Sequence, residues 1–128
     1  MPLVRISLRE GKSPSFLEAI SETIHQAMVE TINVPPDDRF QIFTEHSQEG
    51  LVYDPGYLGI KRSDDLVIIQ ITLNAGRTLD QKRALYSALA SRLAKNPGLR
   101  KEDVLIGLVE VGKENWSFGN GEMSYPPN

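Results

Sequence analysis

The second residue of this 128-residue sequence is a proline, a residue type that can do chemistry only at the head of a chain. Start methionine is commonly removed when a small residue such as proline follows it. Its removal would leave Pro2 with a free secondary amine, the only such group that a ribosomal chain can carry. Because an α-amino group has a pKa of about 8, it can act as a general acid or base near neutral pH. It can also attack an aldehyde as a nucleophile.

Pro2 also has a structural interpretation. Apolar Val4, Ile6 and Leu8 alternate with more polar positions, a pattern typical of a β-strand. Proline has no N–H to donate to a ladder, but it is tolerated at the first position of a strand. Taken alone, Pro2 therefore fits the start of an edge strand as well as it fits a catalytic amine.

A repeat with a spacing of 65 positions bears on that choice. Residues 5–13 align with residues 70–78, so that Ile6 falls on Ile71 and Gly11 on Gly76. The same register continues through residues 20–28 and 85–93 to residues 38–45 and 103–110. Each half is expected to be a strand, a glycine turn, a helix and a second strand. A βαβ unit of this length is right-handed, with parallel strands.

The repeat predicts an α+β fold in which duplicated β-α-β units form a four-stranded mixed sheet with two helices on one face. The strands are expected near residues 3–8, 39–44, 66–71 and 103–109. The helices follow Ser13-Pro14 and Thr78 and end near Asn33 and Asn96, where proline and glycine come next. We expect a single domain over residues 1–128, with halves of about 2–46 and 67–111. Short hairpins are expected in the linker, 47–65, and in the tail, 113–128.

The predicted helices leave the other face of the sheet exposed to solvent in a single chain. Residues 66–71 are apolar on both sides of the predicted strand, as expected for a strand buried on both faces. Helices on one side cannot cover the other. The sequence therefore predicts an obligate oligomer.

Four further motifs stand out in the sequence. They are Val34-Pro35-Pro36-Asp37-Asp38-Arg39-Phe40-Gln41-Ile42, Glu45-His46, Arg62-Ser63-Asp64 and Asn115-Trp116-Ser117-Phe118-Gly119. With Pro2 and the duplicated βαβ pattern, these motifs resemble the tautomerase superfamily, whose members use an amino-terminal proline as catalyst, and in particular malonate semialdehyde decarboxylase and its relatives. The resemblance runs from Pro2 to about Gly119. The family implies a homotrimer with one Pro2 pocket in each subunit.

The resemblance also implies roles for individual residues. Pro2 matches the catalytic amine, and Asp38 matches an acidic residue that orients water or tunes the proline. Trp116 and Phe118 match an apolar wall of the pocket. Structural roles remain open, because Asp38 has the repeat mate Asp103 and because aromatic residues are common in cores and interfaces.

Arg77 matches the second of two carboxylate-binding arginines of the decarboxylase. The first is missing, with Asn74 or Ala75 near its place, because the stretch from Asn74 to Arg77 is one residue longer than the family pattern. A single guanidinium can still hold a substrate carboxylate by two bonds. The repeat mate Lys12 leaves open that Arg77 is only a surface cation at a helix start.

These residues favour keto–enol tautomerisation of a small oxo or enol carboxylic acid, which needs one base and one carboxylate anchor. Decarboxylation of a 3-oxo acid, or hydration of an unsaturated acid, is the alternative within the enzyme class. A catalytically silent trimer that keeps the scaffold for binding is the alternative from another class. The missing arginine counts against decarboxylase specificity and gives weight to the silent trimer.

Composition limits the remaining classes. The net charge of −3 gives no electrostatic footprint for nucleic acid or for an anionic membrane. The sequence has no cysteine and two histidines, so we expect no disulfide, no metal and no cofactor. No apolar run reaches membrane-spanning length, and the start lacks a signal-peptide pattern. We expect a soluble, cytoplasmic protein.

Overall fold

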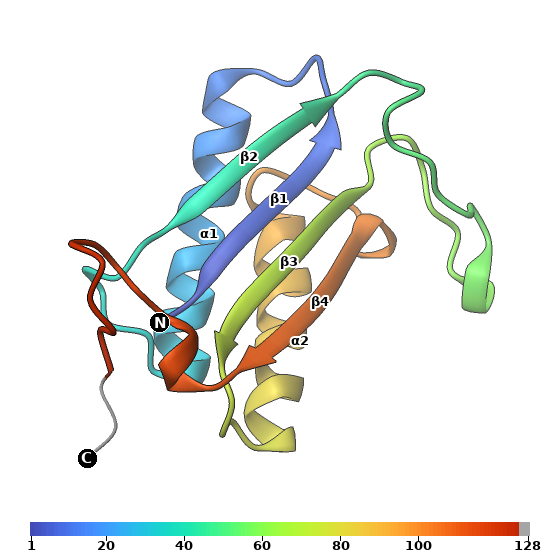
Figure 1. The fold of residues 1–128 in the computed structure, drawn as a ribbon. Helices are drawn as coiled ribbons and strands as arrows, with labels where there is room; N and C mark the ends of the chain where they lie inside the picture. Colours follow the sequence, from blue (N-terminus) through green and yellow to red (C-terminus); the bar gives the residue numbers. More distant parts are fainter. Residues whose placement is uncertain (126–128) are drawn as a thin grey trace.

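The computed structural model describes residues 1–125, in which two helices lie against one face of a four-stranded sheet (Figure 1). The elements in chain order are β1 (Leu3–Arg9), α1 (Pro14–Ile32), β2 (Gln41–His46), β3 (Val67–Asn74), α2 (Leu79–Lys95) and β4 (Val104–Val111). Three short 3-10 turns join them: η1 (Tyr57–Gly59), η2 (Lys101–Asp103) and η3 (Lys113–Asn115). The strand order is β2-β1-β3-β4. Strand β1 is parallel to β2 and antiparallel to β3, and β3 is parallel to β4.

The two halves have the same local structure at equivalent positions, which confirms the predicted duplication of a βαβ unit. Gly11 and Gly76 end the turns after β1 and β3 with φ of 110° and 126°, values that favour glycine. Ser13 and Thr78 then cap α1 and α2, each accepting a hydrogen bond from the backbone N–H three residues on. The predicted fold class, a mixed sheet with both helices on one face, is confirmed.

The core lies between the sheet and the two helices. One face of each central strand is fully buried there, against the apolar stripe of both helices. Its largest members are Ile6, Leu8, Ile20, Ile24, Met28, Ile69, Ile71, Leu73, Leu85 and Leu89. Burying side chains of this size is worth about 1.5–3 kcal/mol each, so this layer holds both repeat halves together.

The structure shifts the bounds of the predicted outer strands. Strand β2 begins at Gln41, not at residue 39, because the chain before it makes a turn closed by the Asp38 N–H, which donates to the Pro35 carbonyl at 3.0 Å. Strand β4 begins after Asp103, which belongs to η2, and runs to Val111 because its ladder with β3 continues to Asn74.

The predicted short hairpins are wrong for the described residues. Residues 47–65 contain η1 and no strand, because the Arg62 side chain donates to carbonyls of Asp54, Tyr57 and Ile60 and so takes up acceptors that a ladder would use. Residues 113–125 contain η3 and a turn at 119–121, in which all three φ angles are positive, but no strand pair follows. Residues 126–128 of the predicted tail lie outside the described part.

The topology gathers separate segments at one end of the sheet. The N-terminus, the last residues of β3 and β4, the end of α1 and the segment after β4 all lie there, whereas the linker projects from the opposite end (Figure 1). A site at the N-terminal end can therefore draw side chains from four parts of the chain.

Candidate active site

Asp38 is the acidic neighbour of the N-terminus. Its Oδ2 lies 3.9 Å from the amino group of Met1. Pro2, the next residue of the chain after Met1, is buried. The loop that carries Asp38 starts where α1 ends, at Asn33, whose φ of 59° is left-handed. In the described structure, the other carboxylate oxygen of Asp38, Oδ1, is buried and has no hydrogen-bond partner.

A buried histidine holds this loop to the helix before it. His25 lies on the core side of α1, only 1% exposed, and its Nε2 is 2.8 Å from the Pro36 carbonyl oxygen. Since a carbonyl can only accept, Nε2 is the donor. The structure thus buries His25, which positions the loop that carries Asp38.

Burial and charge both act on the terminal amine. Burial lowers the pKa of the Met1 amine, Asp38 opposes this change, and the cations of Arg77 and Lys113 add to it. Burial raises the pKa of Asp38, and the terminal amine opposes that shift. At this place the amine is therefore more readily neutral than in water, which is what a general base requires.

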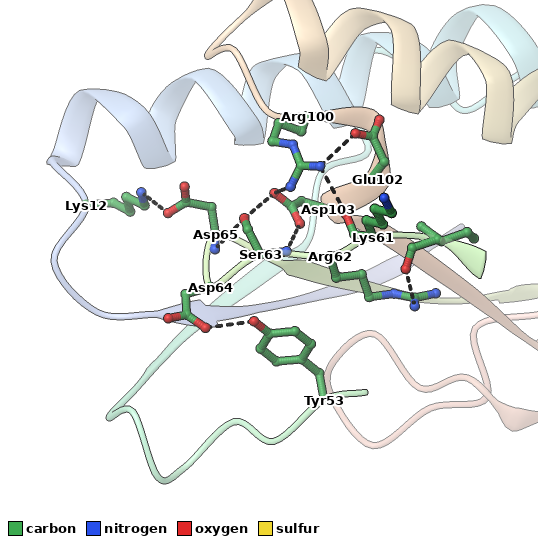
Figure 2. Close-up of polar contacts among 11 residues, drawn as sticks. Lys12, Tyr53, Lys61, Arg62, Ser63, Asp64, Asp65, Arg100, Glu102 and Asp103 are labelled. Carbon is green, nitrogen blue, oxygen red and sulfur yellow. Dashed lines mark hydrogen bonds and ion pairs between the residues drawn. The ribbon is translucent and has the colours of Figure 1, made fainter. Parts of the chain in front are cut away.

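Asp103, the equivalent of Asp38 in the second half of the repeat, is hydrogen-bonded to other parts of the chain. Asp103 is fully buried. Its Oδ1 accepts the Ser63 N–H at 2.7 Å, and its Oδ2 accepts the Ser63 hydroxyl at 2.6 Å (Figure 2). Arg100 lies 3.5 Å away on the same carboxylate. Asp103 is thus a structural residue that anchors the linker, whereas Asp38 has a terminal amine and an unpaired oxygen in place of Ser63.

Arg77 lies in the turn between β3 and α2. Its guanidinium donates to the carbonyls of Asn74 and Ile32, at 3.2 Å and 3.3 Å. Ile32 is the last residue of α1, so its carbonyl belongs to the negative end of the helix. The repeat mate Lys12 is engaged in an ion pair with Asp65 at 2.6 Å. The ion pairs within residues 1–125 include neither Arg77 nor Lys113.

Asn74 links the end of β3 to the segment after β4. Its side-chain oxygen accepts the Trp116 indole N–H at 2.7 Å, and Asn74 itself is 8% exposed. The indole stacks on Phe118 with a centroid distance of 5.1 Å, and Phe118 stacks on Phe40 at 6.4 Å. This bond and these rings bring residues 116–118 over the start of β1.

Two hollows flank the N-terminus. One, of about 260 Å³, is a mostly apolar groove lined by Pro2, Leu3, Phe40, Trp116, Ser117 and Phe118. The other, of about 460 Å³, is a polar basin lined mainly by Met1, Asn74, Arg77, Gln81 and Lys113, with Tyr125 at its border. We call them the aromatic groove and the polar basin.

All six residues singled out from the sequence lie around these two hollows. The groove is lined by Pro2, Trp116 and Phe118, and the basin by Asn74 and Arg77. Asp38 faces the amine of Met1, which also lines the basin. Sequence reasoning missed Phe40, although it stands inside the Asp38-Arg39-Phe40 motif, and Lys113. The only signal for Lys113 was its place just after the last predicted strand.

The described part of the chain offers neither a metal centre nor a membrane span. Within residues 1–125, no three His, Asp or Glu side chains gather in a way that could hold a metal ion. Neither α1 nor α2 is long and apolar enough to cross a membrane.

Comparison with known proteins gives matches over almost the whole chain. Two family profiles, both described as tautomerase enzyme, match residues 38–119 and residues 2–61. A probable tautomerase of Bacillus subtilis (strain 168), YusQ, is 50% identical over 121 residues, which is 94% of this chain and 95% of that protein.

Solved structures agree. The FG41 malonate semialdehyde decarboxylase inhibited by 3-bromopropiolate is 36% identical, with a TM-score of 0.89 over 96% of this chain and 93% of that one. A fused 4-OT, a symmetric trimer, shares the fold with a TM-score of 0.77 at 24% identity, over 94% of each chain. With half of its residues identical to a named relative and a family profile over more than half of its length, this chain is an enzyme of the tautomerase superfamily.

Proposed function

We propose that the amine of Pro2, released when Met1 is removed, catalyses keto–enol tautomerisation of a small oxo or enol carboxylic acid. The observation that carries the proposal is the setting of the terminal amine: partly buried, beside one carboxylate and beside two cations that have no carboxylate partner among residues 1–125. Burial and the two cations lower the pKa of the Met1 amine at this place, and an amine on Pro2, the next residue, would share these surroundings and be favoured in its neutral form. A neutral amine can take a proton from the carbon next to a carbonyl and return it to the oxygen.

The other residues have supporting roles in this proposal. Arg77 binds the substrate carboxylate in this proposal, because it lines the polar basin, is held there by bonds to the Asn74 and Ile32 carbonyls, and forms no ion pair with an acidic side chain of residues 1–125. Asp38 tunes the amine from 3.9 Å away. Asn74 holds Trp116, which with Phe118 forms the apolar wall of the site. We expect no cofactor, since acid–base transfer needs none.

The N-terminus itself provides the test. Chains with and without Met1 are separated and identified by mass, and each is given the enol form of a small 2-oxo acid while its ultraviolet absorbance is followed. The chain that starts at Pro2 should consume the enol much faster than the chain that keeps Met1, because in the latter the Pro2 nitrogen is an amide without a basic lone pair and the free amine belongs to Met1, which does not line the aromatic groove. Equal turnover by both chains would remove Pro2 from the mechanism. Absence of turnover in both would favour the silent scaffold.

A second candidate is decarboxylation or hydration of the malonate semialdehyde type. It is favoured by the likeness to the FG41 decarboxylase and by the Oδ1 of Asp38, which has no hydrogen-bond partner among residues 1–125. Release of carbon dioxide from a 3-oxo acid, assayed beside the enol, distinguishes the two reactions.

We also propose that the active form is a homotrimer. Ile42, Leu105 and Val109 lie on the face of the sheet away from the helices, and each is about 40% exposed in the single chain. A fused 4-OT of the same fold is a symmetric trimer. Neighbouring copies would cover these side chains.

A further inference from the structure

We propose that Lys113 is a second carboxylate-binding cation of this site, and that the carboxylate of the substrate binds in the polar basin while its apolar part lies in the aromatic groove. The proposal relies on the proposed function only in taking the substrate to be a carboxylic acid. It assigns to Lys113 a role that the missing arginine leaves open.

The balance of charge around the amine supports it. Lys113 and Arg77 line the same basin, and both lower the pKa of the terminal amine, so both act on it electrostatically. Two carboxylates oppose these cations: Asp38 beside the amine, and Glu110, which lies near Gly76 and Arg77 but is already paired with Lys82 at 2.6 Å. A hollow with this excess of positive charge attracts an anion. The aromatic ring of Tyr125, with its centroid 5.9 Å from the Lys113 ammonium, is the neighbour that limits its motion.

The sheet fixes where Lys113 lies. Strand β4 pairs with β3 up to Val111 and Asn74, and the Ala75 N–H then donates to the Val111 carbonyl at 2.9 Å. Lys113 is the first residue of η3, two positions after Val111. The parallel ladder thus places η3 beside the turn that carries Arg77, so that two cations distant in sequence line one hollow.

The difference between the two hollows sets the orientation of the substrate. Met1 lines the basin and Pro2 lines the groove, so removal of Met1 would leave the Pro2 amine at the boundary of the two hollows, where a ligand can extend into both. The groove is walled by Phe40, Trp116 and Phe118 and contains no charged side chain. An apolar or aryl substituent therefore fits the groove, and the carboxylate fits the basin. The expected substrates are oxo or enol acids that carry such a substituent.

Binding can be measured without turnover, because Trp116 is the only tryptophan and lies in the groove. The chain that starts at Pro2 is titrated with 3-phenylpropanoate, which has no oxo group to react, and with its neutral amide, while tryptophan fluorescence is followed. Lys113→Gln should weaken binding of the carboxylate about 3- to 10-fold and leave the amide unchanged. Added salt should reduce the difference in affinity for the carboxylate between the parent and the variant.

Lys101→Gln is the matched control. Lys101 starts the 3-10 turn at the other end of β4, is exposed and lies outside both hollows, so its loss should change neither affinity. Equal carboxylate affinity in Lys113→Gln and the parent would overturn the proposal. Equal weakening of carboxylate and amide, or a parent that does not prefer the carboxylate, would overturn it as well. A parent that binds the carboxylate but fails to turn over enols would refute the proposed function and leave the role of Lys113 standing.

Discussion

At the scale of single residues, the equivalent aspartates of the two repeat halves, Asp38 and Asp103, have different surroundings. Asp103 has both oxygens bonded to Ser63 and anchors a loop. Asp38 faces a terminal amine and keeps one buried oxygen unpaired among residues 1–125. A buried unpaired oxygen costs about 1–3 kcal/mol, which is consistent with the proposed role of Asp38 in the site.

Pro2→Ala tests the amine directly. Alanine supplies a primary amine with a different pKa and a freer first torsion, in place of a secondary amine held by its ring. Loss of general acid–base catalysis should lower kcat on enol acids by about 10²–10⁴-fold, measured in steady state on chains whose first residue is verified by mass. The fold should survive, since Pro2 precedes β1 and lies outside the core cluster. Parent-like turnover would leave Pro2 as a strand-start residue.

The pH profile tests the electrostatics of the site. If the neutral amine of Pro2 is the base, kcat/KM rises with pH through the pKa of that amine, which we expect to lie below its ordinary value because burial lowers the pKa of the Met1 amine at the same place. Asp38→Asn removes the anion that favours the protonated amine, so the rise should move to lower pH. Arg77→Gln removes a cation that disfavours it, so the rise should move to higher pH. Shifts in the same direction would contradict this arrangement.

At the scale of elements, the loop between α1 and β2 depends on the helix before it. His25→Leu removes the 2.8 Å bond to Pro36 and leaves a loop carbonyl without its partner. The free energy of unfolding should fall by about 1–3 kcal/mol, measured by denaturant titration. Gln26→Leu, at the next position of α1 but exposed, is the control and should stay within about 0.5 kcal/mol of the parent. Equal stability of the two variants would show that the buried bond contributes nothing.

At the scale of the whole molecule, the uncovered sheet face is the feature to test. Light scattering should give a mass of three times 14.3 kDa at micromolar concentration. Val109→Lys places a charge on that face and should dissociate the trimer, because an unpaired charge is costly to bury. Leu79→Lys, on an exposed side chain at the start of α2, should leave the mass unchanged. A monomeric parent would refute the trimer.

The sequence by itself determined the repeat, the four strands and the two helices, whereas the six candidate site residues came from the family resemblance and remain a prediction. The strands and helices follow from local rules: side-chain periodicity, capping at Ser13 and Thr78, and glycine at the two turns. A spacing of 65 preserved over a whole βαβ unit left little freedom in the topology. The prediction of a hairpin in the linker was wrong, because its glycine turn signals did not reveal that the Arg62 side chain would bind the carbonyls of the linker.

Only the tertiary structure decided which charges are paired. Lys12 and Arg77 are repeat mates, yet an ion pair with Asp65 engages the first, while the second faces the polar basin. Lys113 joins Arg77 because the ladder of β3 and β4 ends beside the N-terminus. Contacts of this kind link residues tens of positions apart. The physical reason that no local pattern predicts them is that pairing depends on which segments the sheet brings to one end.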